Sequence, residues 1–294
     1  MKISVFVPMY NHESYVEKCL TSICLSYSDK IYIVACDDAS TDNTYNVAEK
    51  TLKRLKDIYH DKLDYTLLRN KKNQGICYSL NRCIELIKTE YCYLIASDDY
   101  LIEKSLDLAV DTIHSGNYDA IISDCRVVSM EGKLLFESAF FDYRNASEVA
   151  LKSKYMKDEL VMNWTVPGPS LLLRRSVYDR IGNYQIGLKA EDRDFYLRLL
   201  SQCNVIFSEK KIACYRIHNH NISASEKYKC NINQEMASVN VKHAKLYSGL
   251  SKAYLETYAL ELISGEERIA RRHREKLYKS FKRKLKLLSF LHLI

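Results

Sequence analysis

The stretch Tyr91-Cys-Tyr-Leu-Ile-Ala96, followed by Ser97-Asp98-Asp99, decides the fold. A short apolar run of this kind is typical of a strand that is buried on both faces of a sheet. Two adjacent acids follow where the strand ends, and an open α/β sheet binds its ligands at the carboxyl ends of its strands. The stretch therefore predicts an α/β sheet with a polar site at residues 97–99.

The chain on either side alternates between strand-like and helix-like patterns. Strands are expected at 2–8, 30–36, 63–68, 91–96 and 118–123, with helices between them at 13–27, 42–59, 75–87 and 103–114. Strands that alternate with helices of this length form βαβ units, so the sheet should be mainly parallel. Beyond about residue 123 we expect a hairpin at 125–136, a helix at 146–158, a strand and then a helix at 170–182, a helix at 191–203 and a strand at 211–217, with only helices from about 225.

The composition excludes several classes of protein. With 47% hydrophobic residues in 294, and only 8 Gly and 3 Pro, the chain can bury a large core and holds no long flexible linker. Its ten cysteines form no Cys-x-x-Cys pair, which indicates buried thiols in a reducing compartment. Pro8 interrupts the first apolar run too early for a signal peptide, and no run is long enough to span a membrane.

Four further motifs lie in order along the chain. They are Val7-Pro8-Met-Tyr10-Asn11, Asp37-Asp38-Ala39-Ser-Thr-Asp42, Glu191-Asp192 and Tyr215-Arg-Ile-His218. Each alone has a plain explanation, because Asp, Ser and Thr cap helices and acids favour a helix N-terminus. Asp98 and Asp99 alone are explained in the same way, as a cap for a helix beginning near residue 101. In this order and at these separations, the set resembles the inverting nucleotide-sugar glycosyltransferases of family 2, which have the GT-A fold.

The resemblance implies a nucleotide site in the first half of the chain. Tyr10 would stack on uracil, Asn11 would position the loop after Pro8, and Asp38 would accept a hydrogen bond from the base. Asn73-Gln-Gly75 resembles the start of the family's next helix, where Arg69, Lys71 and Lys72 suit a diphosphate. The family more often has Gly where this chain has Ala39.

The resemblance also implies a metal and a catalytic base. Asp99 would bind Mn²⁺ or Mg²⁺, which prefer hard oxygen ligands, and Asp98 would contact the ribose or the metal. His218 would join the metal or the diphosphate. An inverting transfer needs one carboxylate to take the proton from the acceptor hydroxyl, and we expect Asp192 in that role with Glu191 second.

The region between these motifs would line the acceptor pocket. Trp164 and Ser170 belong to the stretch Trp164-Thr-Val-Pro-Gly-Pro-Ser170, and Trp164 can stack on the face of a sugar. A loop anchored in the core explains Trp164 equally well.

The end of the chain carries its excess charge. Residues 266–294 hold ten Lys or Arg and three Glu, which accounts for the whole net charge of +7. Leu277, Phe281, Leu285 and Leu288 share one helical face, so this segment reads as an amphipathic helix on an anionic membrane surface. Packing of that face against the catalytic domain or a partner chain is the alternative. The charge is confined to one segment without a recognition motif, which argues against nucleic acid as a partner.

The sequence thus predicts a GT-A catalytic domain at 1–224 and a helical extension at 225–294. Residues 1–123 would be its nucleotide-binding half and 124–224 its acceptor-binding half. The expected enzyme moves a sugar from a UDP-sugar to a lipid-linked glycan in the synthesis of a bacterial surface polysaccharide such as O-antigen or capsule. It would lie on the cytoplasmic face of the inner membrane. The alternatives are a nucleotidyltransferase and a non-catalytic carbohydrate- or membrane-binding protein on the same fold.

Overall fold

The computed structural model describes residues 2–218, 226–291 and 293. The chain divides into two compact units, and each is described by itself. The first comprises Met1–Ala139, Pro167–Gly187 and Cys203–Ile217, and the second comprises Phe140–Val166, Leu188–Gln202 and His218–Ile294. The boundary expected at residue 224 lies outside the described residues.

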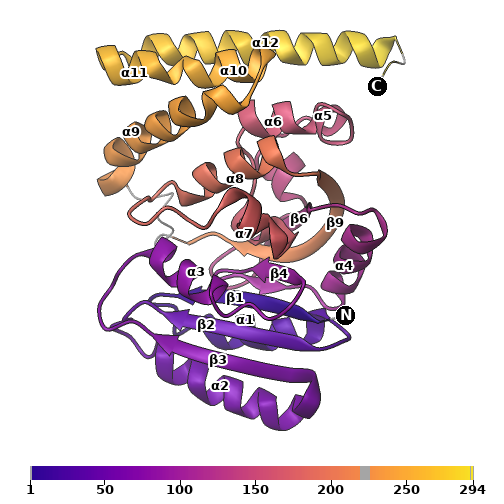
Figure 1. Cartoon of the computed structure of the whole chain (residues 1–294), viewed down its shortest axis with the longest axis vertical. Coiled ribbons are helices and arrows are strands. Elements are labelled where there is room, and N and C mark those ends of the chain that lie inside the picture. The colour runs from indigo at the N-terminus through magenta and orange to yellow at the C-terminus, as the bar shows by residue number, and fades with distance from the viewer. Residues whose placement is uncertain (1, 219–225, 292, 294) are drawn as a thin grey trace. The chain divides into compact units, whose positions relative to one another are not determined.

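The first unit is built on one sheet, which holds nine strands among the described residues (Figure 1). The strand order is β3-β2-β1-β4-β8-β6-β9-β5, with β7 paired to β6. The strands are β1 (Ile3–Met9), β2 (Ile31–Asp37), β3 (Leu63–Arg69), β4 (Tyr91–Leu94), β5 (Tyr100–Leu101), β6 (Ala120–Val128), β7 (Leu134–Phe136), β8 (Leu171–Arg174) and β9 (Val205–Arg216). The long ladders β1–β2, β2–β3 and β6–β9 are parallel, which confirms the expected α/β fold with a mainly parallel sheet.

Helices pack against the sheet of this unit. They are α1 (Val16–Ser26), α2 (Thr44–Tyr59), α3 (Ile76–Ile84), α4 (Ser105–Ser115) and α7 (Ser176–Ile181). Every residue of β1 and β2 is buried, as expected for parallel strands that are covered on both faces. Because β2, β1 and β4 are neighbours and parallel, their carboxyl ends lie at one edge of the sheet, where the loops 10–15, 38–43 and 95–99 begin.

The sequence misplaced some elements after the first four strands. The hairpin is confirmed, with Gly132 at φ +88° in its turn, but β6 joins the strand expected at 118–123 to the first arm of that hairpin. The helix expected at 146–158 is two short helices, α5 (Glu148–Leu151) and α6 (Met156–Met162). The last strand begins at Val205 because it pairs along the whole of β6, although its polar middle hides this in the sequence.

The second unit is helical. Besides α5 and α6 it contains α8 (Glu191–Gln202), α9 (Glu226–His243), α10 (Gly249–Glu256), α11 (Tyr258–Ser264) and α12 (Glu267–Phe290). One buried cluster joins α12 to α5 and α6 through Phe281, Leu285, Ala150 and Met162. The apolar stripe of α12 therefore packs inside this unit, which contradicts the expectation that this stripe contacts a membrane. Among the described residues we find no helix with the length and hydropathy of a membrane span.

Candidate functional site

The carboxylate of Asp38 organises the loop that precedes α3. Its Oδ1 accepts hydrogen bonds from Asn70 Nδ2 at 2.6 Å and from the N–H of Gln74 at 2.9 Å. Its Oδ2 accepts from the N–H of Gly75 at 2.8 Å. Asp38 is buried, and its carboxylate accepts these three hydrogen bonds from donors within the protein. The N–H of Gly75, which was expected to face a diphosphate, donates to Asp38 instead. Asn73 is exposed, and its role stays a prediction.

The loop after β1 is bonded to the loop after β2. The N–H of Asn11 donates to Ser40 Oγ at 3.0 Å, and Asn11 Oδ1 accepts from the N–H of Thr41 at 2.9 Å. Pro8 is buried inside β1, so it shapes the strand end rather than presenting a side chain. Tyr10 is 44% exposed, which leaves its ring free to stack on a base.

Two residues of these loops have left-handed backbone. Asn11 has φ +54°, which Asn tolerates, but Ala39 has φ +59°, where a Cβ atom is strained. The position at which the resembling family more often has Gly is therefore one at which Gly relieves strain.

Ala39→Gly is expected to raise the free energy of unfolding by about 0.5–1 kcal/mol, because the left-handed penalty exceeds the added entropy of the unfolded chain. Ala48→Gly, inside α2, is the matched control and should lower the same quantity by about 1 kcal/mol. Urea unfolding of both variants checks this, and equal destabilisation by the two would show that Ala39 is not strained.

Asp98 and Asp99 are both buried at the same sheet edge. Burial and then the neighbouring charge of Asp98 raise the pKa of Asp99 well above its usual value. Two adjacent buried carboxyls repel each other when ionised, so a bound cation would stabilise them. Carboxylate oxygens are the ligands that Mg²⁺ and Mn²⁺ prefer, so the chemistry of the pair fits a divalent metal.

Arg216 holds this pair of acids, and the sequence analysis missed it. Its backbone N–H donates to Asp99 Oδ1 at 2.7 Å, and its Nε donates to the carbonyl of Asp98 at 2.8 Å. Its Nη1 donates to the carbonyl of Ser129, and its guanidinium lies over the ring of Tyr15. The signal was present, since Arg216 is the second residue of the Tyr-Arg-x-His motif, but the expectation used only His218.

Gly168 and His12 also border the acids in the first unit. Gly168 is exposed, and a Cβ atom there would lie 4.0 Å from Asp99 Oδ2, so this glycine lies next to that oxygen. His12 Nε2 lies 3.9 Å from Asp98 Oδ2, while its Nδ1 lies 2.8 Å from Ser97 Oγ. An imidazole at this place offers a nitrogen atom of the kind that binds divalent metals, beside the carboxylate oxygens. His218 follows the last residue of this unit directly and is counted in the second, so its metal role stays a prediction.

In the second unit, Glu191 and Asp192 begin α8 as expected. Burial raises the pKa of Asp192 to about 6. Burial, and then the charge of Asp192, raise the pKa of Glu191 well above its usual value. Raised pKa values in two neighbouring carboxyls are typical of acid–base sites, and the choice of Asp192 as the base stays a prediction.

Glu235 of α9 fixes the backbone just before this pair. Its carboxylate accepts hydrogen bonds from the N–H of Lys189 at 2.9 Å and from the N–H of Ala190 at 3.3 Å. No sequence pattern indicates this contact, because Glu235 lies more than forty residues away in a helix with no motif.

The other polar residues of α8 serve the structure of the second unit. Burial opposes the ionisation of Asp194, but hydrogen bonding to His243 and the charge of Arg198 outweigh it and hold the pKa of Asp194 below its usual value.

Trp164 is half-buried, with its ring 5.0 Å from that of Tyr196 and with the guanidinium of Arg193 5.3 Å above it. A contact of Trp164 with a sugar therefore stays a prediction.

The structure contradicts the expectation for Ser170. Its side chain is fully buried in the first unit, and its Oγ lies 3.5 Å from Cys125 Sγ. It has no surface to offer an acceptor. The exposed residue of the stretch 164–170 is Gly168.

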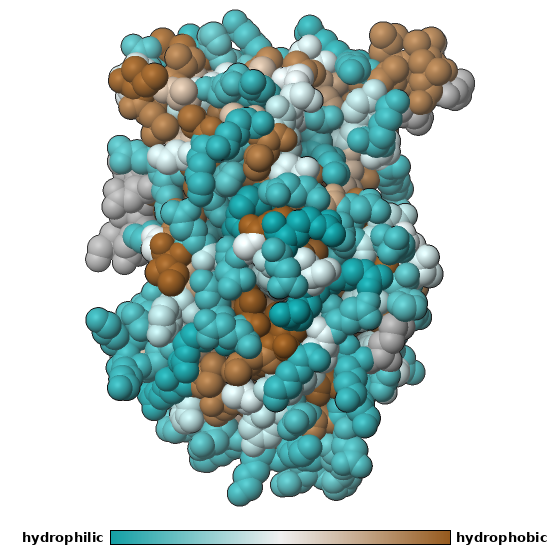
Figure 2. Space-filling view, in the orientation of Figure 1, coloured by the Kyte–Doolittle hydropathy of each residue, from teal (hydrophilic) through white to brown (hydrophobic). Residues whose placement is uncertain are grey.

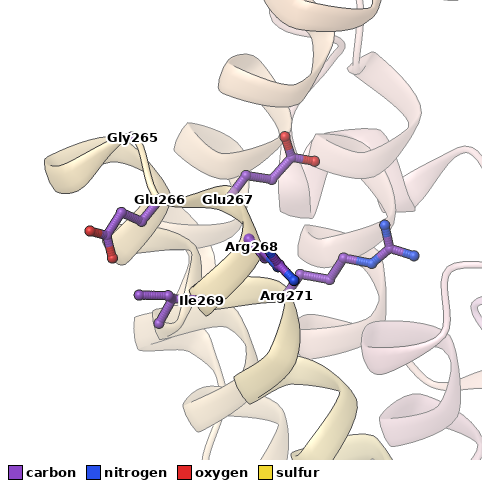
Figure 3. Close-up of a pocket in the computed structure, with 6 residues that line it drawn as sticks. All are labelled: Gly265, Glu266, Glu267, Arg268, Ile269 and Arg271. Carbon is purple, nitrogen blue, oxygen red and sulfur yellow. The ribbon is translucent and has the colours of Figure 1, made fainter.

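A shallow hollow of about 460 Å³ lies at the turn between α11 and α12. It is lined by Gly265, Glu266, Glu267, Arg268, Ile269 and Arg271, whose labelled side chains spread outward from one turn of the chain (Figure 3). Because these side chains diverge, the hollow lacks the converging polar groups of a small-molecule site.

The comparison with protein families decides the identity of the chain. The model of glycosyl transferase family 2 matches residues 4–182, which is more than half of the sequence. The chain belongs to this family. The match includes both nucleotide-side motifs and Asp98-Asp99, whereas Glu191, Asp192 and His218 lie beyond it. The membership confirms the resemblance to this family seen in the sequence.

Several curated relatives of this family 2 chain come from bacteria. An uncharacterised glycosyltransferase of Mycoplasma genitalium is 30% identical, over 42% of this chain and 41% of its own length. One of Rickettsia typhi is 23% identical, over 74% of this chain and 64% of its own length. The GalNAc(5)-diNAcBac-PP-undecaprenol β-1,3-glucosyltransferase of Campylobacter jejuni is 24% identical over 89% of each chain. The chain thus spans less than two thirds of the first two relatives.

Solved structures confirm that the family 2 chain has the GT-A fold. TarS 1–349 of S. aureus, in complex with UDP-GlcNAc, has a TM-score of 0.65 and 21% identity, and the match covers 90% of this chain and 72% of that one. The mannosyltransferase PcManGT of Pyrobaculum calidifontis, in complex with GDP-Man and Mn²⁺, has a TM-score of 0.66 and 16% identity, and the match covers 95% and 74%.

Proposed function

We propose that the chain is an inverting transferase that moves a sugar from a UDP-sugar to a lipid-linked glycan acceptor. One observation carries the proposal: Asp98 and Asp99 are buried side by side at the carboxyl ends of parallel strands, with Arg216 hydrogen-bonded to both and with the exposed Gly168 next to Asp99 Oδ2. This arrangement suits the diphosphate of a nucleotide sugar bound through a divalent cation. Family membership favours it over the nucleotidyltransferase alternative.

The residues take the following roles in the proposal. Asp99 and Asp98 hold Mn²⁺ or Mg²⁺, with His12 beside Asp98 and with His218 as a further ligand. Such a metal, when bound, supplies charge that stabilises the leaving diphosphate. Tyr10 stacks on uracil, and Asp38, with the loop that it organises, lies beside the base.

Asp192 is the base of the proposed reaction. Its carboxylate takes the proton from the acceptor hydroxyl while that oxygen forms a bond to C1 of the sugar and the bond from C1 to the UDP oxygen breaks. Glu191, its neighbour at the start of α8, is the second candidate for this role. An α-linked donor then gives a β-linked product.

Two relatives support the choice of substrates. The Campylobacter jejuni relative acts on a glycan carried by undecaprenyl diphosphate, according to its name, and its match runs along 89% of this chain. The TarS structure contains UDP-GlcNAc. A lipid-linked acceptor and the basic segment 266–294 together support a place at the cytoplasmic face of the inner membrane, in the synthesis of a surface polysaccharide.

Binding of a donor panel tests the proposal. UDP-glucose, UDP-galactose, their N-acetyl forms and GDP-mannose are each added with Mn²⁺, Mg²⁺ or EDTA, and the Tm and the slow hydrolysis of the donor are measured. We expect one UDP-sugar to raise the Tm and to be hydrolysed with a metal, and EDTA to abolish both effects. If no nucleotide sugar binds under any metal condition, the chain is not a transferase of this kind and the non-catalytic alternative replaces it.

A further inference from the structure

The face of α12 that points away from the second unit is basic. Ala270, Phe281 and Leu285 are the buried residues of this helix, so they mark its inward side. At 3.6 residues per turn, the opposite side carries six basic residues, all exposed. They are Arg268, Arg272, Lys276, Lys279, Arg283 and Lys286.

None of these six forms an ion pair with a residue that the structure describes. Basic residues elsewhere on the helix do have partners: Arg271 pairs with Glu275 at 3.3 Å, and Lys282 and Lys284 lie over the rings of Tyr278 and Tyr155. The outward row is thus an unbalanced strip of positive charge along most of a 24-residue helix. A row of charges of this length is complementary to an extended anionic surface rather than to a single anion.

Exposed apolar side chains follow this strip at the end of the helix. Leu287 is 58% exposed, Phe290 79%, Leu291 50% and Leu293 62%. Leu287 and Phe290 lie on the same outward side as Arg283 and Lys286, one turn farther along. Figure 2 shows this end of α12 as a brown patch beside teal side chains. Ile269 and Ile263, 45% and 85% exposed, flank the other end of the strip.

We propose that α12 lies on an anionic lipid bilayer, with its outward basic row against the headgroups and Leu287, Phe290, Leu291 and Leu293 among the acyl chains. A bilayer of anionic lipids matches both features, because its headgroups attract the basic row and its acyl chains bury the apolar side chains. A nucleic acid would attract the basic row but would leave the apolar side chains exposed to water. The sequence pattern placed the membrane on the apolar stripe of α12, but that stripe packs inside the unit. This surface is where the chain would meet the membrane that holds the lipid-linked acceptor of the proposed function. The contacts and exposures that support it are those of α12 and do not depend on the catalytic residues.

Flotation of the full chain with vesicles tests the inference. The vesicles are phosphatidylcholine alone, or phosphatidylcholine with phosphatidylglycerol, at low and at high salt. We expect binding only to the anionic vesicles, weakened by salt. The triple variant Arg272→Glu, Lys279→Glu, Arg283→Glu should lose at least about a hundredfold in affinity, because each reversal turns an attraction into a repulsion.

Matched variants separate the electrostatic from the apolar contribution to membrane binding. Lys50→Glu, Lys53→Glu and Lys210→Glu together change the net charge equally at exposed positions of the first unit and should leave flotation unchanged. Leu287→Ser with Phe290→Ser should remove the binding that persists at high salt.

Two flotation results would overturn the inference: equal binding to neutral and anionic vesicles, or equal binding of the two triple variants. A third is that the chain binds duplex DNA and does not bind anionic vesicles. Binding of the UDP-sugar, measured on the same samples, should be the same in all variants. A chain that floats but binds no nucleotide sugar would refute the proposed function and leave the membrane face standing.

Discussion

Asp192→Asn is expected to lower kcat by about 10²–10⁴-fold, the usual contribution of a general base, while the affinity for the donor stays unchanged. The amide has nearly the same shape as the carboxylate but cannot take the proton from the acceptor hydroxyl. Initial rates with donor and acceptor give kcat, and a titration with the UDP-sugar gives the donor Kd. A loss of donor affinity as large as the loss of kcat would contradict the role of base.

The pH profile provides a second readout of the same role. Because burial raises the pKa of Asp192 to about 6, the fraction of ionised base, and with it kcat/KM, should rise with pH through about 6 and level off above it. The rise should vanish in Asp192→Asn. Glu191→Gln is the matched control, and it should keep the rise, since the proposed reaction assigns the proton to Asp192. If Glu191→Gln is the variant that loses both activity and the rise, Glu191 is the base.

The second large effect is expected from Asp99→Asn. This variant keeps an oxygen that can accept the hydrogen bond from the N–H of Arg216, but it removes one charge from the proposed metal site. We expect activity to fall by about 10³-fold, equivalent to about 4 kcal/mol of lost transition-state stabilisation. The increase in Tm that Mn²⁺ and the donor give to the unaltered chain should disappear.

The control for this change is Asp57→Asn, at an exposed position of α2. It should alter neither the activity nor the effect of Mn²⁺ on the Tm. An Asp99→Asn variant that still gains thermal stability from Mn²⁺ and the donor would place the metal elsewhere.

The first four strands and the acids that follow them could be predicted from the sequence for one physical reason. Strand ends are local features, and in a parallel sheet they meet at one edge, so Asp38, Asp98 and Asp99 could be placed without knowledge of distant contacts. The residues that hold these acids could not be placed in this way. Arg216 lies more than a hundred residues from the acids, and although the motif at 215–218 contains it, the motif does not show that its Nε donates to the carbonyl of Asp98.

The errors have equally specific causes. Ser170 stands two residues from the exposed Gly168, and a change of burial over so short a distance is not visible in composition. For α12 the spacing of Phe281 and Leu285 correctly identified an apolar face. Periodicity identifies such a face but not its partner, which here is the cluster with Ala150 and Met162.

The position of β8 has a consequence for how the chain is made. This strand lies antiparallel between β4 and β6, so β4 finds its second neighbour only about eighty residues after it has itself been synthesised. At roughly 5–20 residues per second, the nascent chain carries the unpaired edge of β4 for about 4–16 s. An unpaired strand edge is a template for association with other chains. The ribosome-bound intermediate that ends before Arg174 is thus the stage at which this protein is most vulnerable to aggregation.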